Sequence, residues 1–438
     1  MTKIVLIGAG SAIFGLGTIS DIFNSSILRG ATITLHDIDF KALKKTQLLA
    51  EKFKDEFSRD FKIEVTSDRK EALKDANFVV ISIEIGQRFD LWEQDWKIPL
   101  QYGFKQIYGE NGGPGGLFHA LRIIPPILDI CDDIQEISPN AFVFNYSNPM
   151  QRICHAVTSK YPSLNFVGLC HEINSMNEQL PVLMKTDFSN IEFRAGGLNH
   201  LSILLEVRYK DTGIDGYPII HNRCKDFYTS IVNEYDDYHR SKPGAERGVF
   251  FELYRTYGYL PITVDSHLGE YIQWAHSVAD HHGINEFYNN YKKKCLNFHE
   301  GTSSYSKFFD PKRKMRERII PIIEAIIEDS GVEEAAVNIP NENLIFDLPK
   351  DIVVEVPAKI NKSGLNGVCL KNFPSAFGRL LNNQVGVIKL TTDAILNKSK
   401  HSAYQALLVD PVVDNPAAAS NLLDTMLETQ KEYLNYLR

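Results

Sequence analysis

The stretch Lys3-Ile-Val-Leu-Ile-Gly8-Ala-Gly10-Ser-Ala-Ile-Phe-Gly15 decides the fold of the N-terminal half of the chain. A short apolar run ends at two glycines, and apolar residues then recur at roughly helical spacing as far as residue 22. This order predicts a strand, a tight turn and a helix. A second strand-like run, residues 32–36, ends at Asp37, about where dinucleotide-binding folds carry the acidic residue that binds a ribose hydroxyl.

The glycine turn has the chemistry of a nucleotide site. Its spacing departs from G-x-G-x-x-G because Ile13 stands where a small residue is usual, but its place between a strand and a helix favours cofactor binding over an ordinary tight turn. Backbone N–H groups at the helix start would hold a pyrophosphate, and Asp37 would repel a 2′-phosphate, which predicts NAD rather than NADP. The residues predicted to bind the cofactor are Gly8, Gly10, Ser11, Ala12, Asp37 and Asn145.

Strand-like and helix-like stretches alternate along the first half of the chain. This alternation predicts an α/β fold with a Rossmann-like, doubly wound parallel sheet. The further strands are expected at 62–66, 78–83, 141–145 and 165–169, and the helices at 40–55, at 117–136 and from about 149.

The pattern changes near residue 195, and 438 residues are enough for two domains. We expect an NAD-binding domain over 1–195 and a mixed α+β domain for substrate, metal and oligomerisation over 196–438. The second part has a strand at 201–207, long helical stretches over 218–335, β-structure around Ile345 and at 351–357, and helices in the last sixty residues.

Composition indicates a soluble protein with small-molecule ligands. The 47 basic and 55 acidic residues give a formal net charge of −8, so no basic field attracts nucleic acid or an anionic membrane. The N-terminal apolar run is too short for a signal peptide, and no stretch approaches the roughly 20 apolar residues of a membrane span. These features predict a cytoplasmic location, where the six cysteines stay reduced and at least one is free to bind a metal.

Cys170 and His200 are the candidate metal ligands. Cys170 follows the strand expected at 165–169, at the carboxyl edge of a parallel sheet, where ligands of such folds bind. A thiolate and an imidazole would leave open coordination positions, as a catalytic metal requires. On spacing alone a structural role is favoured, because an isolated cysteine is usually a small buried side chain.

Three other segments carry polar side chains suited to a ligand. Asn148 precedes Pro149 after another sheet strand, Glu110 and Asn111 lie in a glycine-rich loop, and residues 261–271 group Asp265 with His267. Each segment has a structural alternative: a turn, a helix-entry loop and a polar helix start, respectively.

Taken together, these motifs closely resemble glycoside hydrolase family 4, in order from residue 3 to the C-terminal helices. The resemblance rests on Gly8-Ala-Gly-Ser-Ala-Ile-Phe14, Asn111-Gly-Gly-Pro-Gly-Gly116, Asn145-Tyr-Ser-Asn-Pro-Met150, Gly168-Leu-Cys-His-Glu-Ile173 and Gly197-Leu-Asn-His200. This family is the NAD-dependent exception to two-carboxylate glycosidase chemistry. The resemblance reverses the structural interpretation of Cys170 and His200.

The resemblance implies a redox elimination and addition. Hydride transfer from the sugar C3 to NAD acidifies the C2 proton, a base removes it, the C1 leaving group is eliminated, water adds, and the hydride returns. A divalent metal, typically manganese, binds the C2 and C3 oxygens and stabilises the enediolate charge. The family's habit also implies a homodimer or homotetramer.

Residue roles follow from the matching motifs. Cys170 and His200 would bind the metal, and His171 would be the acid for the leaving group. The base is Asp265, with Tyr257 or Tyr259 as the reserve. Sugar or cofactor contacts are assigned to Glu110, Asn111, Asn148, Asn199 and His267.

The residues after Cys170 bear on the substrate. Family members with a Cys-His sequence act on unphosphorylated α-glycosides. The stretch Cys170-His-Glu172, followed by an aliphatic residue, most resembles that of the α-galacturonidases, and the α-galactosidases are the next most similar group. Ser266 departs from that pattern, which has Arg there. A carboxylate-binding arginine is then either missing or supplied from elsewhere, such as by Arg88 or Arg122. An α-glucosidase of the same family and an NAD-dependent hydroxy-acid dehydrogenase are the alternatives, and a catalytically inactive NAD-binding sensor is disfavoured.

Overall fold

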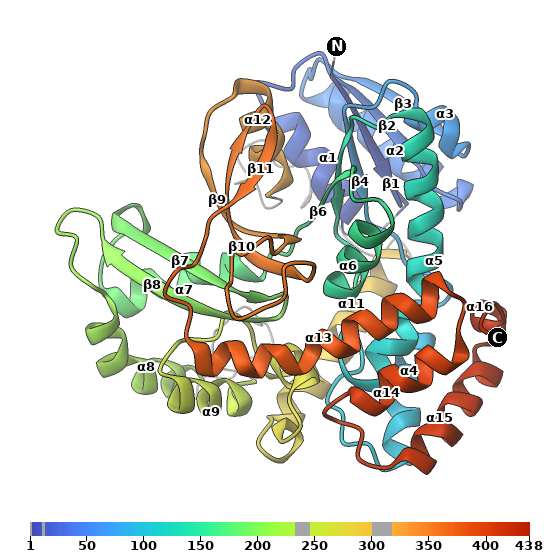
Figure 1. The fold of residues 1–438 in the computed structure, drawn as a ribbon. Coiled ribbons are helices and arrows are strands. Elements are labelled where there is room, and N and C mark those ends of the chain that lie inside the picture. The colour runs from blue at the N-terminus through green and yellow to red at the C-terminus, as the bar shows by residue number, and fades with distance from the viewer. Residues whose placement is uncertain (1, 11–13, 233–245, 300–317) are drawn as a thin grey trace.

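The N-terminal half forms the parallel part of one large sheet (Figure 1). The structure is a computed structural model that describes residues 2–10, 14–232, 246–299 and 318–438. Six parallel strands lie in the order β3-β2-β1-β4-β5-β6, which is the order of a Rossmann fold. Their bounds are β1 Lys3–Ile7, β2 Thr32–His36, β3 Lys62–Thr66, β4 Phe78–Ile81, β5 Phe142–Asn145 and β6 Asn165–Gly168.

The sheet continues without a break into an antiparallel part. Strand β6 pairs with β9, and the order runs on through β10 and β7 to β8, with β11 paired to β10. The expected domain boundary between residues 195 and 196 falls inside β7, and the two-domain division stays a prediction. The bounds are β7 Ile191–Leu198, β8 Leu201–Tyr209, β9 Glu333–Pro340, β10 Val353–Asn361 and β11 Gly364–Gly367.

Helices cover both faces of the parallel strands. Alternate residues of β1 face opposite sides, because side chains alternate along a strand. Val5 and Ile7 pack in the core formed with α5 and α6, whereas Ile4 and Leu6 pack in the core formed with α1 and α2. The bounds of these helices are α1 Phe14–Asn24, α2 Phe40–Glu56, α5 Gly113–Ile137 and α6 Met150–Lys160.

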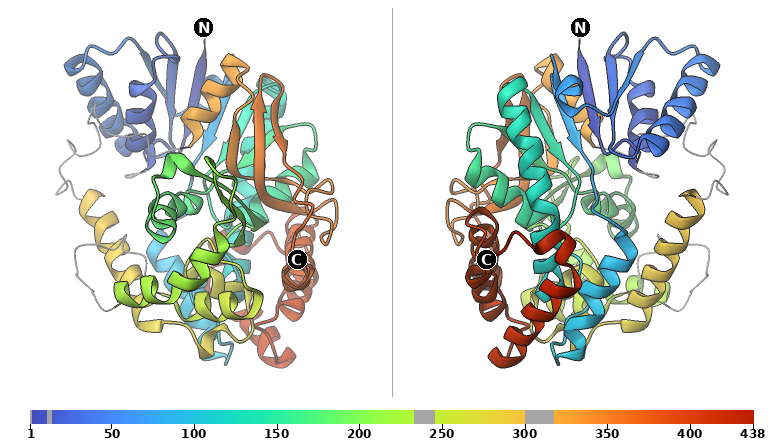
Figure 2. Two further views of the ribbon diagram at one scale, coloured as in Figure 1. Left: turned by 90° about the vertical axis from the view of Figure 1, so that its left-hand side faces the viewer. Right: turned by 90° about the vertical axis from the view of Figure 1, so that its right-hand side faces the viewer.

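C-terminal helices complete both cores, so the two halves of the chain are packed together. Helix α12 packs with α1 and α2, and helices α13 to α15 pack with α5 and α6. Figure 2 shows α12 beside the N-terminal strands and helices α14 to α16 at the opposite end of the molecule. The bounds are α12 Ile319–Glu328, α13 Ser375–Leu396, α14 Lys400–Val409, α15 Pro416–Thr429 and α16 Lys431–Leu434.

Helix α3 packs with α5 on one face of the parallel strands, and the remaining helices lie around the carboxyl edge of these strands and the antiparallel part. The long helices expected over 218–335 are confirmed in the described residues, except that β9 begins at Glu333 and takes the end of this range. Ile345 was expected in β-structure, but it is a buried residue in the turns between β9 and β10. The bounds are α3 Arg69–Leu73, α4 Arg88–Gln101, α7 Ser175–Met184, α8 Tyr217–Val232, α9 Gly248–Tyr257, α10 Asp265–Leu268 and α11 His281–His299.

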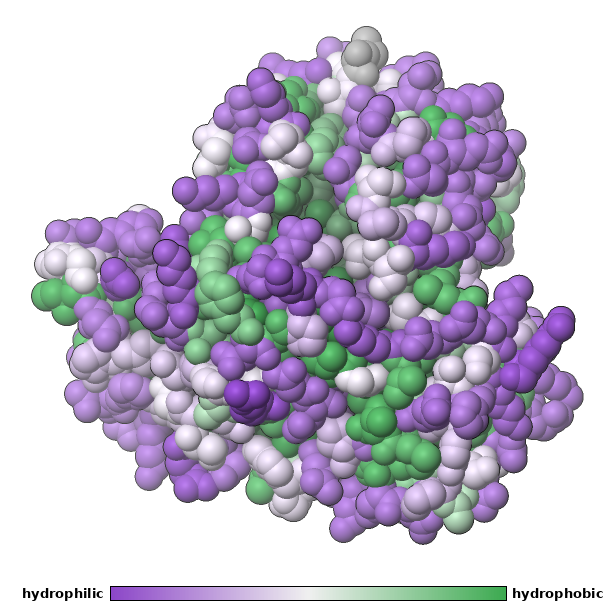
Figure 3. Space-filling model, in the orientation of Figure 1, coloured by the Kyte–Doolittle hydropathy of each residue, from purple (hydrophilic) through white to green (hydrophobic). Residues whose placement is uncertain are grey.

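The surface is mainly polar on the face shown in Figure 3. Among the described residues, no helix is both long and apolar enough to cross a membrane.

Candidate active site

The glycine turn after β1 is closely packed against the ends of β2 and β4. Gly8 has a φ of +88°, and an added Cβ there would lie 2.1 Å from the carbonyl oxygen of Ser82. The N–H of Gly10 donates to Oδ2 of Asp37 at 2.8 Å. The predicted cofactor residues Gly8, Gly10 and Asp37 therefore lie together at the carboxyl edge of the sheet, where a dinucleotide fits. The predicted residues Ser11 and Ala12 lie outside the described residues.

Asn145 and Asn148 follow β5 at the same edge. The Asn145 amide Nδ2 donates to the carbonyl oxygen of Ser147 at 2.9 Å, and Asn145 is fully buried, so it holds its own loop. Its expected contact with the cofactor has no support in this geometry. Asn148 is half-buried and precedes a cis peptide bond to Pro149.

Cys170 and His200 are in contact. Cys170 comes two residues after β6, and His200 lies in the turn between β7 and β8 with a left-handed φ of +64°. The thiol Sγ is 3.4 Å from the imidazole Nε2. Ligand bonds of roughly 2.3 Å for sulfur and 2.1 Å for nitrogen, at angles from square to tetrahedral, separate the two atoms by about 3.1 to 3.6 Å. The contact therefore fits two ligands of one divalent ion.

The protonation of this pair is set by burial. Burial lowers the pKa of His200, which keeps the imidazole neutral as a metal ligand must be, and burial raises the pKa of the Cys170 thiol. A bound cation would reverse the second effect by stabilising the thiolate. No group of three or more His, Cys, Asp or Glu side chains is arranged to hold a metal in the described part of the chain. Two protein ligands leave positions open, as in catalytic sites.

His267 stacks on the metal-ligand candidate His200. The two ring centroids are 4.2 Å apart with an interplanar angle of 18°, and Nε2 of His267 is 3.8 Å from Oε1 of Glu172. Burial lowers the pKa of His267, but surrounding carboxylates outweigh this effect and raise it. Several carboxylates therefore surround this ring, and burial raises the pKa of two of them, Glu270 and Glu246, to about 7. The carboxylates belong to Glu172, Glu110, Glu270 and Glu246.

Glu270 connects the glycine-rich loop to the segment that carries His267. Its Oε1 accepts the backbone N–H of Glu110 at 2.5 Å and that of Asn111 at 2.9 Å, and its Oε2 accepts the Asn111 amide at 3.2 Å. An added Cβ on Gly112 would lie 2.6 Å from the carbonyl oxygen of Glu270, so the loop needs glycine there. Glu270 was not predicted as a site residue, although it stands in the same polar cluster of the sequence.

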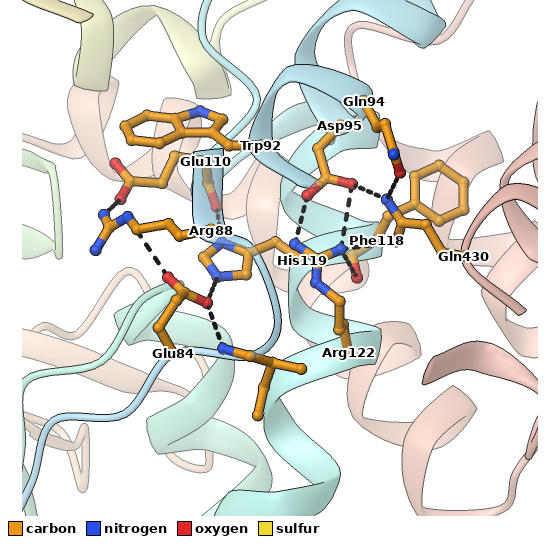
Figure 4. Close-up of polar contacts among 12 residues, drawn as sticks. Glu84, Arg88, Trp92, Gln94, Asp95, Glu110, Phe118, His119, Arg122 and Gln430 are labelled. Atoms are coloured by element: carbon orange, nitrogen blue, oxygen red, sulfur yellow. Dashed lines mark hydrogen bonds and ion pairs between the residues drawn. The ribbon is translucent and has the colours of Figure 1, made fainter. Parts of the chain in front are cut away.

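Figure 4 shows how the two candidate arginines differ. Arg88 pairs with Oε1 of Glu110 at 2.9 Å and with Oε2 of Glu84 at 3.6 Å, and its side chain is one-third exposed. Arg122 is buried, and its guanidinium is 2.7 Å from Oδ2 of Asp95. Only Arg88 therefore lies beside a predicted sugar-binding residue, and Arg122 ties helices together.

Comparison with known proteins decides the family. Residues 3–186 match the model of family 4 glycosyl hydrolases, and residues 195–413 match the model of the C-terminal domain of the same family. The chain belongs to glycoside hydrolase family 4. It is therefore a glycoside hydrolase, as the motifs predicted.

Relatives within family 4 have several substrates. The chain is 47% identical to an alpha-glucosidase from Erwinia rhapontici over 100% of both chains. It is 30% identical to an alpha-galactosidase from Bacillus subtilis strain 168 over 94% of this chain and 93% of the relative. It is 27% identical to an alpha-galacturonidase from Thermoanaerobacter italicus over 99% and 97%.

Solved structures confirm the Rossmann-like fold. A 6-phospho-alpha-glucosidase from gut microorganisms, in complex with NAD and Mn²⁺, has a TM-score of 0.82 at 22% identity and covers 98% of each chain. A malate dehydrogenase from Cryptosporidium parvum has a TM-score of 0.55 at 13% identity, over 90% of this chain and 99% of that one. The family 4 fold thus shares its architecture with hydroxy-acid dehydrogenases.

Two residues that the family resemblance put forward as the base have other surroundings. The Asp265 carboxylate is buried and accepts three backbone N–H groups, from Gly248 at 2.7 Å, Phe250 at 3.0 Å and Asp280 at 3.0 Å. It acts here as a cap on the start of α9. Tyr257 packs edge-on against Phe377 and lines a pocket with residues of β8 and α8. This geometry supports neither residue as the base.

Three other predicted site residues differ in their surroundings. His171 directly follows Cys170 and is exposed, as a proton donor to a leaving group needs to be. Tyr259 lines the same pocket as Tyr257. The Asn199 amide donates to Oε2 of the buried Glu355 at 2.8 Å, and the expected contact of Asn199 with substrate stays a prediction.

Proposed function

We propose that this protein hydrolyses α-glucosides that carry neither a phosphate nor a carboxylate, using NAD and a divalent metal such as Mn²⁺. The observation that carries the proposal is the 3.4 Å contact between Cys170 and His200 at the edge of a nucleotide-binding sheet. The 47% identity to an alpha-glucosidase favours the glucoside over the galactoside or galacturonide expected from the residues after Cys170.

The metal would be held by Cys170 and His200. A bound divalent cation supplies Lewis-acid stabilisation of negative charge on two neighbouring sugar oxygens. The chain contributes one soft and one borderline ligand in a buried, acidic surrounding, and His267 packs on the His200 ring, which fixes its orientation. This small ligand set leaves room for a sugar.

The dinucleotide would bind along the turn that contains Gly8 and Gly10. NAD supplies a reversible hydride acceptor, so that the cofactor is regenerated in each turnover. The backbone around Gly10 is held by Asp37, whose carboxylate would bind a ribose hydroxyl and exclude a 2′-phosphate.

A neutral sugar is favoured because Arg88, the candidate arginine beside the glycine-rich loop, is already paired. The carboxylates of Glu84 and Glu110 flank the Arg88 guanidinium, which leaves little net positive charge for a uronate or a phosphate. The carboxylates around His267 would repel an anionic sugar further. Ser266, where galacturonidase-like sequences have arginine, supports the same choice.

Proton transfers are assigned from exposure and reach. His171 is exposed beside Cys170 and is proposed as the acid that protonates the leaving group. Glu110 and Asn111 are proposed to hold sugar hydroxyls, since Glu270 fixes their backbone in the loop.

A cytoplasmic homodimer or homotetramer is proposed for the assembly.

A panel of aryl α-glycosides tests the substrate. With NAD, Mn²⁺ and a thiol present, the aryl α-glucoside is expected to react faster than the galactoside, galacturonide and 6-phosphoglucoside. Chelation of the metal is expected to abolish the reaction, and no net NADH is expected. Net NADH formed from a hydroxy acid would instead support the dehydrogenase alternative.

A further inference from the structure

One row of residues crosses five strands at the candidate metal site. Gly168 of β6 is the register partner of Asn338 in β9, which is the partner of Glu355 in β10. Glu355 is in turn the partner of Gly197 in β7, and Gly197 is the partner of Ser202 in β8. Cys170 follows one end of this row by two residues, and His200 lies in the turn between the last two members.

The Glu355 carboxylate joins the members of this row through its hydrogen bonds. Its Oε2 accepts the Asn199 amide at 2.8 Å and the Asn338 amide at 3.3 Å, and its Oε1 accepts the Ser202 hydroxyl at 2.8 Å. The Asn338 amide also donates to the carbonyl oxygen of Gly168 at 3.3 Å. Glu355 is therefore connected to both segments that carry the metal-ligand candidates.

The charge of this carboxylate has no direct counterion in the described residues. Glu355 is 5% exposed, and the three groups that donate hydrogen bonds to it are neutral. Arg318 interacts electrostatically with Glu355 but forms its ion pair with Glu334. A buried anion without a cation is costly. A divalent ion at Cys170 and His200 would supply the missing positive charge.

We propose that Glu355 is a positioning residue for the metal site, a role that rests on the proposed function. It holds the strand end before Cys170 and the turn that carries His200 in one arrangement, and its negative charge favours a divalent cation between them. The left-handed backbone of His200 makes this support necessary, because a residue other than glycine rarely adopts that conformation unaided.

The test is Mn²⁺ binding to the full-length protein, measured by calorimetry and by the EPR signal of free Mn²⁺. Glu355→Gln is expected to weaken Mn²⁺ binding by about 10- to 100-fold, the usual effect of losing a partner behind a metal ligand. NAD affinity is expected to change less than about twofold, since the glycine turn is untouched. Glu333→Gln is the matched control. Glu333 lies in β9, next to the β10 strand of Glu355, and pairs with Arg194 of β7.

A second variant keeps the test decisive if Glu355→Gln fails to fold. Ser202→Ala removes one hydrogen bond to the carboxylate and keeps its charge, and it is expected to weaken Mn²⁺ binding several-fold. Unchanged Mn²⁺ affinity in a folded Glu355→Gln protein, or in Ser202→Ala where the first variant is lost, overturns the inference alone. A wild-type protein that binds no Mn²⁺ overturns the proposed function together with it.

Discussion

The Sγ atom of Cys170 lies 3.4 Å from Nε2 of His200, although the two residues belong to different parts of the sheet. Cys170 follows the last parallel strand, and His200 is in an antiparallel hairpin that reaches it only through β9 and β10. The proposed metal site therefore depends on the join between the parallel and antiparallel parts. This arrangement places it at the carboxyl edge, beside the nucleotide turn.

Removal of the thiol is expected to abolish metal binding and leave NAD binding intact. Cys170→Ala takes away one of two protein ligands, so kcat/KM is expected to fall by at least about 100-fold, comparable to the loss of one group that stabilises the transition state. Mn²⁺ titration and NAD titration measure the two effects separately. Cys369→Ala is the control, because the Cys369 thiol donates to the carbonyl oxygen of Asn343, outside the candidate site. Full activity of Cys170→Ala would refute the ligand assignment.

Asp37 is expected to set the choice of dinucleotide. Asp37→Asn removes the charge that opposes a 2′-phosphate, so NADP affinity is expected to rise and NAD affinity to fall, each by about tenfold or ~1.4 kcal/mol. Fluorescence titration with both cofactors gives the ratio. Asp39→Asn is the control, because it changes the N-cap residue of α2 and leaves the Asp37 carboxylate in place. An unchanged ratio of NAD affinity to NADP affinity would mean that Asp37 does not contact the ribose.

Glu84 is expected to keep Arg88 neutralised over the working pH range. Burial would raise the Glu84 pKa, but His119 and Arg88 lower it to about 2, so the carboxylate stays ionised above about pH 3. Because the folded pKa is depressed, the stabilisation from this group is present above its unfolded pKa of roughly 4.3 and is lost as the pH falls through 2.

Glu84→Gln therefore leaves Arg88 with one carboxylate. We expect the ratio of kcat/KM for an aryl α-glucuronide over the α-glucoside to rise by about tenfold. Glu93→Gln serves as the control, since Glu93 is in the same helix as Arg88 but pairs with Lys292. If this kcat/KM ratio rises in both variants, or in neither, Arg88 does not determine the choice between a charged and a neutral sugar.

Asp265 is expected to act on stability first. Asp265→Ala leaves three backbone N–H groups without their acceptor, which costs about 1 to 3 kcal/mol for each group that stays buried and unsatisfied and lowers the melting temperature. Thermal unfolding measures this loss. If Asp265→Asn instead folds normally, binds NAD and Mn²⁺, and has lost exchange of the sugar C2 proton, the base role implied by the family resemblance is restored.

The sequence predicts the parallel half well because its signals are local. Apolar runs of strand length alternate with helices, and the glycine turn identifies the first βα unit. Strand β7 was missed because Gly196 and Gly197 interrupt its pattern, and β9 was missed because it opens with two glutamates. Both strands are held by pairing with neighbours distant in sequence.

The site shows the same limit. Cys170 and His200 were identified through motifs, but Glu270 contacts Glu110 across 160 positions and Glu355 contacts Asn199 across 156. Such buried carboxylates have no local pattern that separates them from surface glutamates. Asp265 was predicted from its neighbours in sequence, whereas its contacts with the start of α9 are visible only in three dimensions.

The central claim is that a sugar is oxidised and reduced again during hydrolysis, and solvent exchange tests it most directly. The aryl α-glucoside is incubated in deuterated water with NAD and Mn²⁺, and the released glucose is analysed by NMR and mass spectrometry. We predict one deuterium at C2, no net NADH, and loss of both cleavage and exchange in Cys170→Ala. Glucose released with its C2 proton fully retained would contradict the account.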